Sequence, residues 1–233
     1  MNLSSDHPKI KELLSVGREL GLWRRGNAYV YYCNQQLFPG FDFRDKRMLE
    51  IGAGQGIYSL FAAACGAREI VALEPSGDGS HESSSVAVFY KLVDRLRFVN
   101  IKVFEVPFQE FEHQGQPFDL ILLKDCINHL DEQKCITLRE QTASWEYYRE
   151  LFKKLHALLN PGGLVVLTDC ANRSFWNDFG FTNPFCPSIE WFKHQSPEIW
   201  AKVLSEAGFV DPKITWMYNS MFFDLGKLFK NKL

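Results

Sequence analysis

The chain has no long apolar run. Apolar residues make up 46% of its 233 residues, but no run approaches the ~20 residues that a membrane-spanning helix needs. Residues 1–10 are polar and contain no apolar core, so we expect no secretory signal peptide. The sequence therefore predicts a protein without a membrane span, located in the cytoplasm.

An excess of charge of one sign is also missing. The chain carries 26 Lys and Arg against 28 Asp and Glu, a formal net charge of −2. A protein that holds nucleic acid through its overall charge is strongly basic, so no nucleic-acid partner is expected. The apolar and charged fractions are those of a globular protein and exclude disorder over most of the chain.

Cysteines at ligand or disulfide spacing are absent. No two of the six cysteines form a CxxC pair, and no histidine lies at zinc-finger spacing. In a chain of this length such cysteines are typical of free, mostly buried thiols. We expect neither a disulfide scaffold nor a structural zinc site.

What the chain does contain is a regular alternation of apolar runs and helical patterns. Strands are expected at 47–51, 69–74, 98–106, 118–123, 164–168 and 209–216, and helices at 10–23, 27–38, 57–65, 83–92, 145–159 and 196–207. The expected strands are apolar throughout, as strands buried on both faces are. This pattern predicts an α/β fold: a doubly wound, mostly parallel sheet of about six to seven strands with helices on both faces.

A glycine-rich turn follows the first expected strand. Gly52, Gly54 and Gly56 stand at alternate positions, where glycine permits a positive φ and lets a ligand touch the backbone. A dinucleotide fingerprint would need its third glycine at position 57, which is Ile57, and this counts against NAD and FAD. Glu74 ends the next strand, where a carboxylate can accept both hydroxyls of a ribose.

These residues resemble a known family. The spacing E-x-G-x-G-x-G over 50–56 resembles the first motif of class I S-adenosylmethionine-dependent methyltransferases. Residues 118–122 resemble the family's fourth-strand motif, and 159–164 resemble its L-x-P-G-G turn. The motifs occur in family order over about 46–170. The resemblance implies a Rossmann-like methyltransferase domain at 45–233 behind an N-terminal helical cap at 1–44.

The resemblance also implies the cofactor S-adenosylmethionine, with S-adenosylhomocysteine as product. The expected cofactor-binding residues lie at strand ends and in the loops that follow them: Glu50, Gly52, Gly54, Gly56, Glu74, Phe108, Gln109 and Lys124. Two alternatives stay open among them. Glu50 either faces the cofactor's ammonium group through water or caps loop amides, and Phe108 and Gln109 either neighbour the adenine or merely pack and face solvent.

The segment after the fourth strand is expected to carry the catalytic groups. Methyl transfer mainly requires alignment and a dry site, but a hydroxyl acceptor must also lose its proton. His129 and Asp125 are the candidates, although His129 could instead bond a backbone group at a helix start. Asp125, Asp169 and Asn172 roughly resemble the divalent-ion layout of some small-molecule O-methyltransferases, but the Asp-Asn pair of that layout is absent, because Asp169 precedes Cys170. No metal is expected.

Two aromatic-rich insertions, near 131–150 and 170–195, are expected to form a lid over the site or a small satellite core. Aromatic faces stack on sugar rings and other flat ligands. Candidate acceptor contacts are Tyr31, Trp176 and His194. The segment 183–197 resembles bacterial methyltransferases associated with surface-polysaccharide or glycan modification, which implies a small-molecule or glycan acceptor.

The sequence thus predicts an S-adenosylmethionine-dependent O-methyltransferase. A non-catalytic cofactor-binding subunit and an NAD-linked oxidoreductase remain alternatives. The family's last strand lies within 218–225 or is missing, which would leave a sheet edge exposed. A second copy of the chain could cover such an edge, so a homodimer is one expectation.

Overall fold

The computed structural model describes residues 7–22, 26–75, 84–172, 179–181 and 189–215. The chain forms two compact units. The first, the sheet unit, comprises Met1–Cys126 and Leu158–Leu167. The second, the helical unit, comprises Ile127–Ala157 and Thr168–Leu233. Residues of the expected N-terminal cap belong to the same unit as the sheet.

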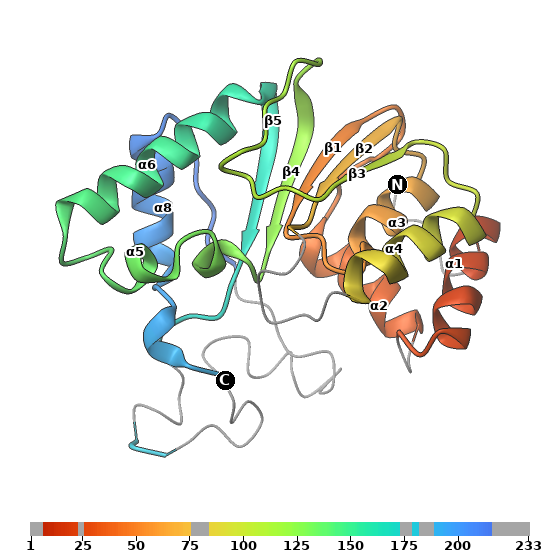
Figure 1. The fold of residues 1–233 in the computed structure, drawn as a ribbon, viewed down its shortest axis with the longest axis horizontal. Helices are drawn as coiled ribbons and strands as arrows, with labels where there is room; N and C mark the ends of the chain where they lie inside the picture. The colour runs from red at the N-terminus through yellow and green to blue at the C-terminus, as the bar shows by residue number, and fades with distance from the viewer. Residues whose placement is uncertain (1–6, 23–25, 76–83, 173–178, 182–188, 216–233) are drawn as a thin grey trace. The chain divides into compact units, whose positions relative to one another are not determined.

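The sheet has the order β3-β2-β1-β4-β5 (Figure 1). Its strands are β1 (Arg47–Ile51), β2 (Glu69–Leu73), β3 (Ile101–Phe104), β4 (Phe118–Lys124) and β5 (Leu159–Thr168). β1 pairs in parallel with β2 and β4, and β2 pairs in parallel with β3. Ile51 lies opposite both Leu73 and Leu123, so these strands end at one edge. The α/β fold with a parallel sheet is confirmed.

The described residues form five strands, not the expected six to seven. The expected strand at 209–216 is wrong over 209–215, which form no strand. Asp211 has a φ of 58°, and the next residue, Pro212, has no N–H to donate to a neighbouring strand, so this segment cannot continue a ladder. Residues 216–233 lie outside the described residues.

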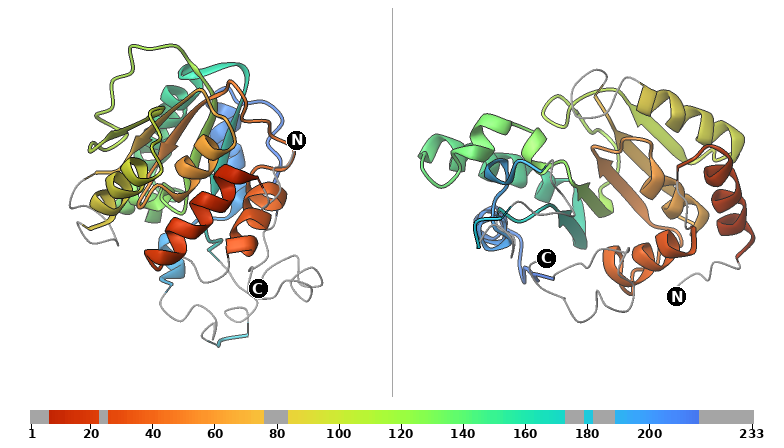
Figure 2. Two further views of the ribbon diagram at one scale, coloured as in Figure 1. Left: turned by 90° about the vertical axis from the view of Figure 1, so that its right-hand side faces the viewer. Right: turned by 90° about the horizontal axis from the view of Figure 1, so that it is seen from below.

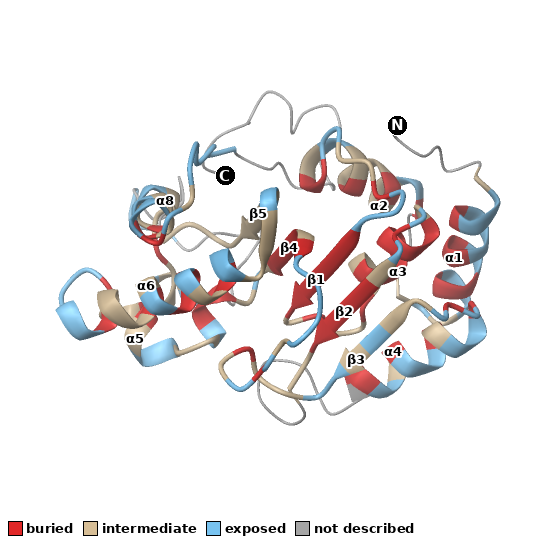
Figure 3. Ribbon diagram, turned by 90° about the horizontal axis from the view of Figure 1, so that it is seen from above, coloured by how far each residue is buried: buried red, intermediate tan, exposed pale blue. Residues whose placement is uncertain are grey.

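Burial is concentrated in the middle of the sheet, as Figure 3 shows. Every residue of β1 is buried, whereas β3 at the edge alternates between half-buried and exposed residues. This agrees with apolar strands covered on both faces. The buried polar side chains of β1, Arg47 and Glu50, therefore each need a partner.

Among the described residues, the sheet unit has the α-helices α1 (Pro8–Glu19), α2 (Gly26–Tyr32), α3 (Ile57–Ala64) and α4 (Ser84–Arg95). α3 packs on β1 and β2, and α1 lies against α3 and α4 (Figure 2). The expected helix at 27–38 continues past α2 as a π-helix, Cys33–Leu37, in which Phe38 N donates to Cys33 O at 2.8 Å. The buried Phe38 ring then packs edge-on against Phe43.

The amino ends of the strands are tied together by two motif residues. Asp119 accepts hydrogen bonds from the Arg47 N–H at 2.8 Å and from Asn160 Nδ2 at 3.1 Å. These contacts join β1, β4 and β5. Asp119 in the fourth-strand motif and Asn160 in the L-x-P-G-G turn thus hold the sheet at the edge opposite the glycine loop.

The helical unit contains the 3-10 turns η2 (Ile127–His129) and η3 (Trp191–Lys193) and the helices α5 (Glu132–Ile136), α6 (Thr142–Ala157) and α8 (Pro197–Glu206). α6 packs against α8, with the buried Tyr148 ring 5.1 Å from that of Trp200. The Tyr148 hydroxyl donates to the Ile127 and Asp131 carbonyls. In the first aromatic-rich insertion, Tyr148 is therefore a core residue of this unit. No helix among the described residues is both long and apolar enough to cross a bilayer.

Candidate active site

The glycine loop joins β1 to α3 across the end of β2. Gly52 N and Ala53 N both donate to Leu73 O, at 2.9 and 3.0 Å. Gly52, Gly54 and Gly56 have φ values of 69°, 54° and 70°, a left-handed conformation that side chains disfavour. The alternate glycines are therefore a requirement of the loop's backbone path.

The space around these glycines separates their roles. A Cβ on Gly52 would lie 2.6 Å from Cys126 Cβ, and one on Gly56 would lie 2.1 Å from the Phe89 ring. At Gly54 a Cβ would meet no described residue within 4 Å. Packing thus explains Gly52 and Gly56, whereas Gly54 adjoins open space that a ligand could enter.

Glu74 lies just beyond β2, beside this opening. Its carboxylate is half-buried, and Oε2 accepts a hydrogen bond from Gly54 N at 2.8 Å. The other carboxylate oxygen retains its lone pairs for further hydrogen bonds. An open glycine backbone with a carboxylate beside it fits the hydroxyls and the cationic amino-acid end of S-adenosylmethionine. The expected cofactor and the residues present therefore agree.

Glu50 is buried inside β1 and bonds to the first turn of α3. Its Oε2 accepts hydrogen bonds from Ser59 N, at 2.9 Å, and from the Ser59 hydroxyl. Burial raises the pKa of Glu50 to about 8, and the neighbouring Glu74 adds to this, although Ser59 and Lys124 oppose it. Glu50 thus satisfies an amide at the start of α3. A water-mediated contact with the cofactor stays a prediction.

A cation lies among tyrosines at the end of β4. Lys124 forms an ion pair with Asp125, and its ammonium is 5.9 Å from the Tyr32 ring centroid and 5.6 Å from that of Tyr58. Burial raises the pKa values of both tyrosines, so they are neutral phenols. Asp125 itself is exposed and has a φ of 54°, a strained conformation that often marks functional loops.

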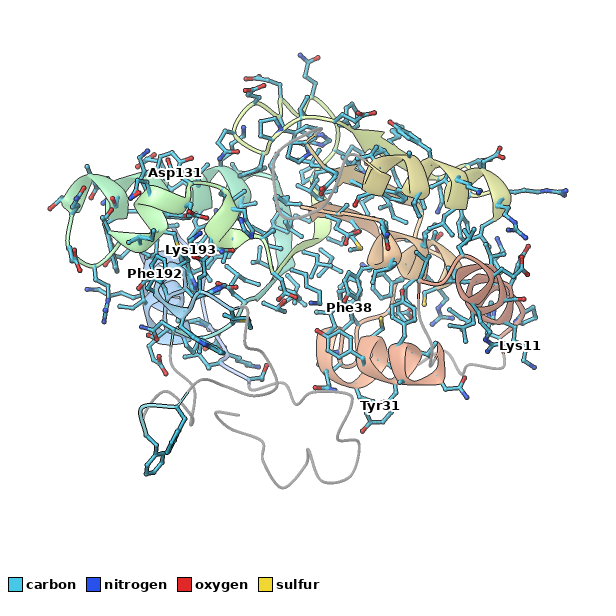
Figure 4. All side chains as sticks on the ribbon, turned by 60° about the horizontal axis from the view of Figure 1, so that its bottom comes forward. Lys11, Tyr31, Phe38, Asp131, Phe192 and Lys193 are labelled. Atoms are coloured by element: carbon cyan, nitrogen blue, oxygen red, sulfur yellow. The ribbon has the colours of Figure 1, made fainter. Side chains whose placement is uncertain are left out.

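Three further predicted residues of the sheet unit stand apart from this cluster. Figure 4 shows the Tyr31 side chain on the outer side of α2, whereas the adjacent Tyr32 points to Lys124. Phe108 is buried and Gln109 is half-buried in the turn after β3. Their contacts with acceptor or adenine remain predictions.

The remaining candidates belong to the helical unit or lie outside the described residues. His129 ends η2, is exposed, and makes no hydrogen bond with another described residue. His194 follows η3, and its Nδ1 lies 3.0 Å from Asp169 Oδ1. Trp176 lies outside the described residues. Within the described residues no group of three or more His, Cys, Asp or Glu could hold a metal ion.

Sequence reasoning missed two of these arrangements. Tyr58 lies two positions after the last loop glycine, which was the signal that could have placed it near the site. The pairing of Asp169 with His194 joins residues 25 positions apart. The sequence signals were the place of Asp169 after β5 and the place of His194 in the aromatic-rich insertion, and neither signal predicts that the two residues pair.

Comparison with known proteins gives a consistent picture. The sequence model of a methyltransferase domain family matches residues 27–211. A putative S-adenosylmethionine-dependent methyltransferase from Listeria monocytogenes superposes with a TM-score of 0.58 at 13% identity, covering 85% of this chain and 90% of that one. A Haemonchus contortus phosphoethanolamine N-methyltransferase, solved with S-adenosylhomocysteine, also gives 0.58, at 17% identity over 89% of this chain and 44% of that one.

Curated relatives match over a shorter stretch. A probable histone-arginine methyltransferase of Oryza sativa is 38% identical over 69 residues, 30% of this chain and 13% of that protein. A protein arginine N-methyltransferase of Chlamydomonas reinhardtii is 36% identical over 75 residues, 32% of this chain and 21% of that protein. The chain thus spans about a fifth or less of the length of these relatives.

Proposed function

Because the chain belongs to the S-adenosylmethionine-dependent methyltransferase family, we propose that it methylates a hydroxyl oxygen of a small-molecule or sugar acceptor. When bound, the cofactor supplies a methyl group on a sulfonium, a strong electrophile. The protein's own residues have to hold the acceptor, exclude water and remove the hydroxyl proton.

Exposed aromatic side chains carry the proposal about the acceptor. Phe179, Phe181 and Phe192 expose 65%, 65% and 63% of their surface, and all three belong to the aromatic-rich insertion at 170–195. Large exposed apolar side chains that gather in one segment often mark a binding surface. Aromatic rings also offer faces on which sugar rings stack. The Phe192 side chain is labelled in Figure 4.

Arginine methylation is the second candidate, favoured by the curated relatives. A guanidinium is held by carboxylates, best in bidentate pairs. Two aspartates between β4 and α5 are already engaged: Asp125 pairs with Lys124, and Asp131 accepts from Lys134 N at the start of α5. A neutral hydroxyl requires no such carboxylate, so these contacts favour an oxygen acceptor.

The test is a methyl-transfer assay with labelled S-adenosylmethionine and a panel of sugars, phenols, phosphoethanolamine and an arginine-rich peptide. We expect transfer to hydroxyl acceptors. In the variants F181A and F192A we expect a raised acceptor KM and unchanged S-adenosylhomocysteine affinity. Val99, 99% exposed, provides a matched control in V99A. Transfer only to the peptide would refute the hydroxyl proposal, and cofactor binding without any turnover would favour a non-catalytic subunit.

The setting and assembly of the protein are part of the same proposal. The five cysteines that the structure describes are all free thiols, which agrees with a reducing compartment such as the cytoplasm. Homodimer formation remains a prediction. The molar mass from light scattering after size-exclusion chromatography tests it.

A further inference from the structure

Lys124 places a positive charge at the end of β4, across the glycine loop from Glu74. In the sheet β1 lies between β2 and β4, and all three strands run in parallel. Glu74 follows β2, Lys124 ends β4 and the glycine loop follows β1, so the two charged residues flank the loop on opposite sides. All of these residues belong to the sheet unit. A ligand lying across the loop therefore meets a carboxylate on one side and an ammonium on the other.

The surroundings of Lys124 hold its ammonium in place. Its side chain exposes 17% of its surface, and its Nζ lies 5.9 Å from the ring centroid of Tyr32 in α2 and 5.6 Å from that of Tyr58 in α3. Burial raises the pKa of both phenols and of the Glu50 carboxyl, so none of the three adds a full negative charge at neutral pH. A lysine packed beside aromatic rings has little rotamer freedom left to lose when it binds an anion.

An anion already lies against this ammonium, because the Asp125 carboxylate forms an ion pair with it. The Asp125 side chain exposes 56% of its surface, and such solvent-exposed pairs contribute little stability. Its backbone is also held in a left-handed conformation, with a φ of 54°. The carboxylate of a ligand can therefore take the place of the Asp125 carboxylate, which is hydrated when it turns away.

We propose that Lys124 is a specificity-determining residue that binds an anionic group of the acceptor, a carboxylate or a phosphate, in exchange for Asp125. This inference rests on the proposed hydroxyl chemistry and narrows the acceptor to a hydroxyl compound that also carries an acid group. A charged donor and a charged acceptor form the stronger class of hydrogen bond, so one such contact distinguishes an acid from its neutral analogue. The sequence assigned Lys124 to the cofactor, whose own carboxylate is the competing anion.

Charge balance favours an anionic acceptor over a neutral or a cationic one. S-adenosylmethionine brings a positively charged sulfonium into a site that already contains Lys124, and like charges repel more strongly where water is excluded. An acceptor anion on Lys124 cancels one of these charges when both substrates are bound. A neutral acceptor supplies no such compensation, and an arginine or amine acceptor adds another positive charge, so Lys124 also selects against those acceptors.

The first test needs no turnover. The protein loaded with S-adenosylhomocysteine is titrated calorimetrically with two matched pairs, 4-hydroxybenzoate with 4-hydroxybenzamide and glucuronate with glucuronamide. We expect the acid of at least one pair to bind at least about tenfold more tightly than its amide. Lys124→Met should abolish this preference, and Lys124→Arg should retain most of it. Lys102, a strand lysine paired with Glu69 at 2.8 Å, provides the matched control K102M, which should keep the preference.

The affinity for S-adenosylhomocysteine distinguishes the two sources of the anion. In K124M it should stay close to that of the wild type. A loss of about tenfold or more, with the acid preference unchanged, would assign Lys124 to the carboxylate of the cofactor and overturn the inference. Equal binding of acid and amide by the wild type in both pairs overturns it as well. Failure of the function proposal is distinguishable, because methyl transfer only to the arginine-rich peptide refutes hydroxyl chemistry whatever the binding ratio is.

The second test uses Asp125→Asn, which removes the competing charge and keeps the shape of the side chain. D125N should bind the preferred acid about two- to fivefold more tightly than the wild type does, with the affinity for the amide unchanged. A merely structural role of Asp125 predicts no such gain. Unchanged or weaker binding of the acid would show that Asp125 does not occupy the subsite and would overturn the exchange. This variant keeps the inference testable even if K124M fails to fold.

Discussion

The glycine loop allows a prediction in which stability and ligand binding are separated. Gly54 and Gly56 share a left-handed backbone, with φ values of 54° and 70°, but only Gly56 has a neighbour in the way. Alanine at either position costs about 1–2 kcal/mol for the left-handed conformation. At Gly56 the Cβ would also stand 2.1 Å from the Phe89 ring, and such overpacking adds about 1–3 kcal/mol.

These free energies translate into melting temperatures. For a chain of this length, 1 kcal/mol corresponds to about 2–4 °C. We therefore expect G54A to melt about 2–8 °C below wild type and G56A about 4–20 °C below it. In calorimetric titration G54A should bind S-adenosylhomocysteine at least about tenfold more weakly, a loss of ~1.4 kcal/mol, because its methyl group would occupy the open space beside Glu74.

The control is Gly40→Ala. Gly40 also has a positive φ, 77°, and a Cβ there would meet no described residue within 4 Å, but it lies in the turn before β1. G40A should therefore lose the same stability as G54A and bind the ligand normally. Wild-type affinity in G54A would refute the argument that a ligand approaches Gly54. Equal melting temperatures for G54A and G56A would refute the packing role of Phe89.

Two further predictions concern hydrogen-bonded carboxylates of β1 and β4. Burial raises the pKa of Glu50 from 4.5 to about 8, so between these pH values the folded protein keeps a proton that the unfolded chain releases. The free energy of unfolding should therefore fall as the pH rises through this range, by up to ~1.4 kcal/mol per pH unit. Urea unfolding of E50Q should lack this slope; an identical slope in both proteins would contradict the assignment. Asp119→Ala leaves the Arg47 amide and Asn160 without their acceptor, which should cost about 1–3 kcal/mol in thermal unfolding while S-adenosylhomocysteine affinity stays unchanged.

Much of the fold was accessible from the sequence because buried parallel strands are apolar throughout. The cores of β1, β2 and β4 and the loop that follows β1 were predicted on that basis. The π-helix at Cys33–Leu37 was not predicted, because its sequence pattern does not differ from that of an α-helix. Its end depends on a tertiary contact, the packing of the Phe38 ring against Phe43. The expected strand at 209–216 was wrong over 209–215 because its apolar residues, such as Phe209 and Ile214, outweighed the backbone limit that Pro212 imposes.

Side-chain direction was harder to predict than secondary structure. Tyr31 and Tyr32 are neighbours of one type, and only the packing of α2 decides that Tyr32 reaches Lys124. The Asp169–His194 pair joins a residue just after β5 to one whose two chain neighbours are bonded to α5. Neither arrangement has a local signal, since each joins residues that lie far apart in the chain.

The residues that reveal the family do not all serve the same end of the sheet. Asp119 and Asn160 tie the amino ends of the strands, whereas Gly54 and Glu74 face the opening at the carboxyl ends. Asp119 and Asn160 therefore stabilise the fold whatever the acceptor is. Gly54 and Glu74 fit a cofactor that the whole family shares. Because neither pair distinguishes one acceptor from another, the acceptor must be recognised by residues outside the motifs. Our proposals assign that recognition to Lys124 at the end of β4 and to the segment after β5, where Phe179, Phe181 and Phe192 are exposed.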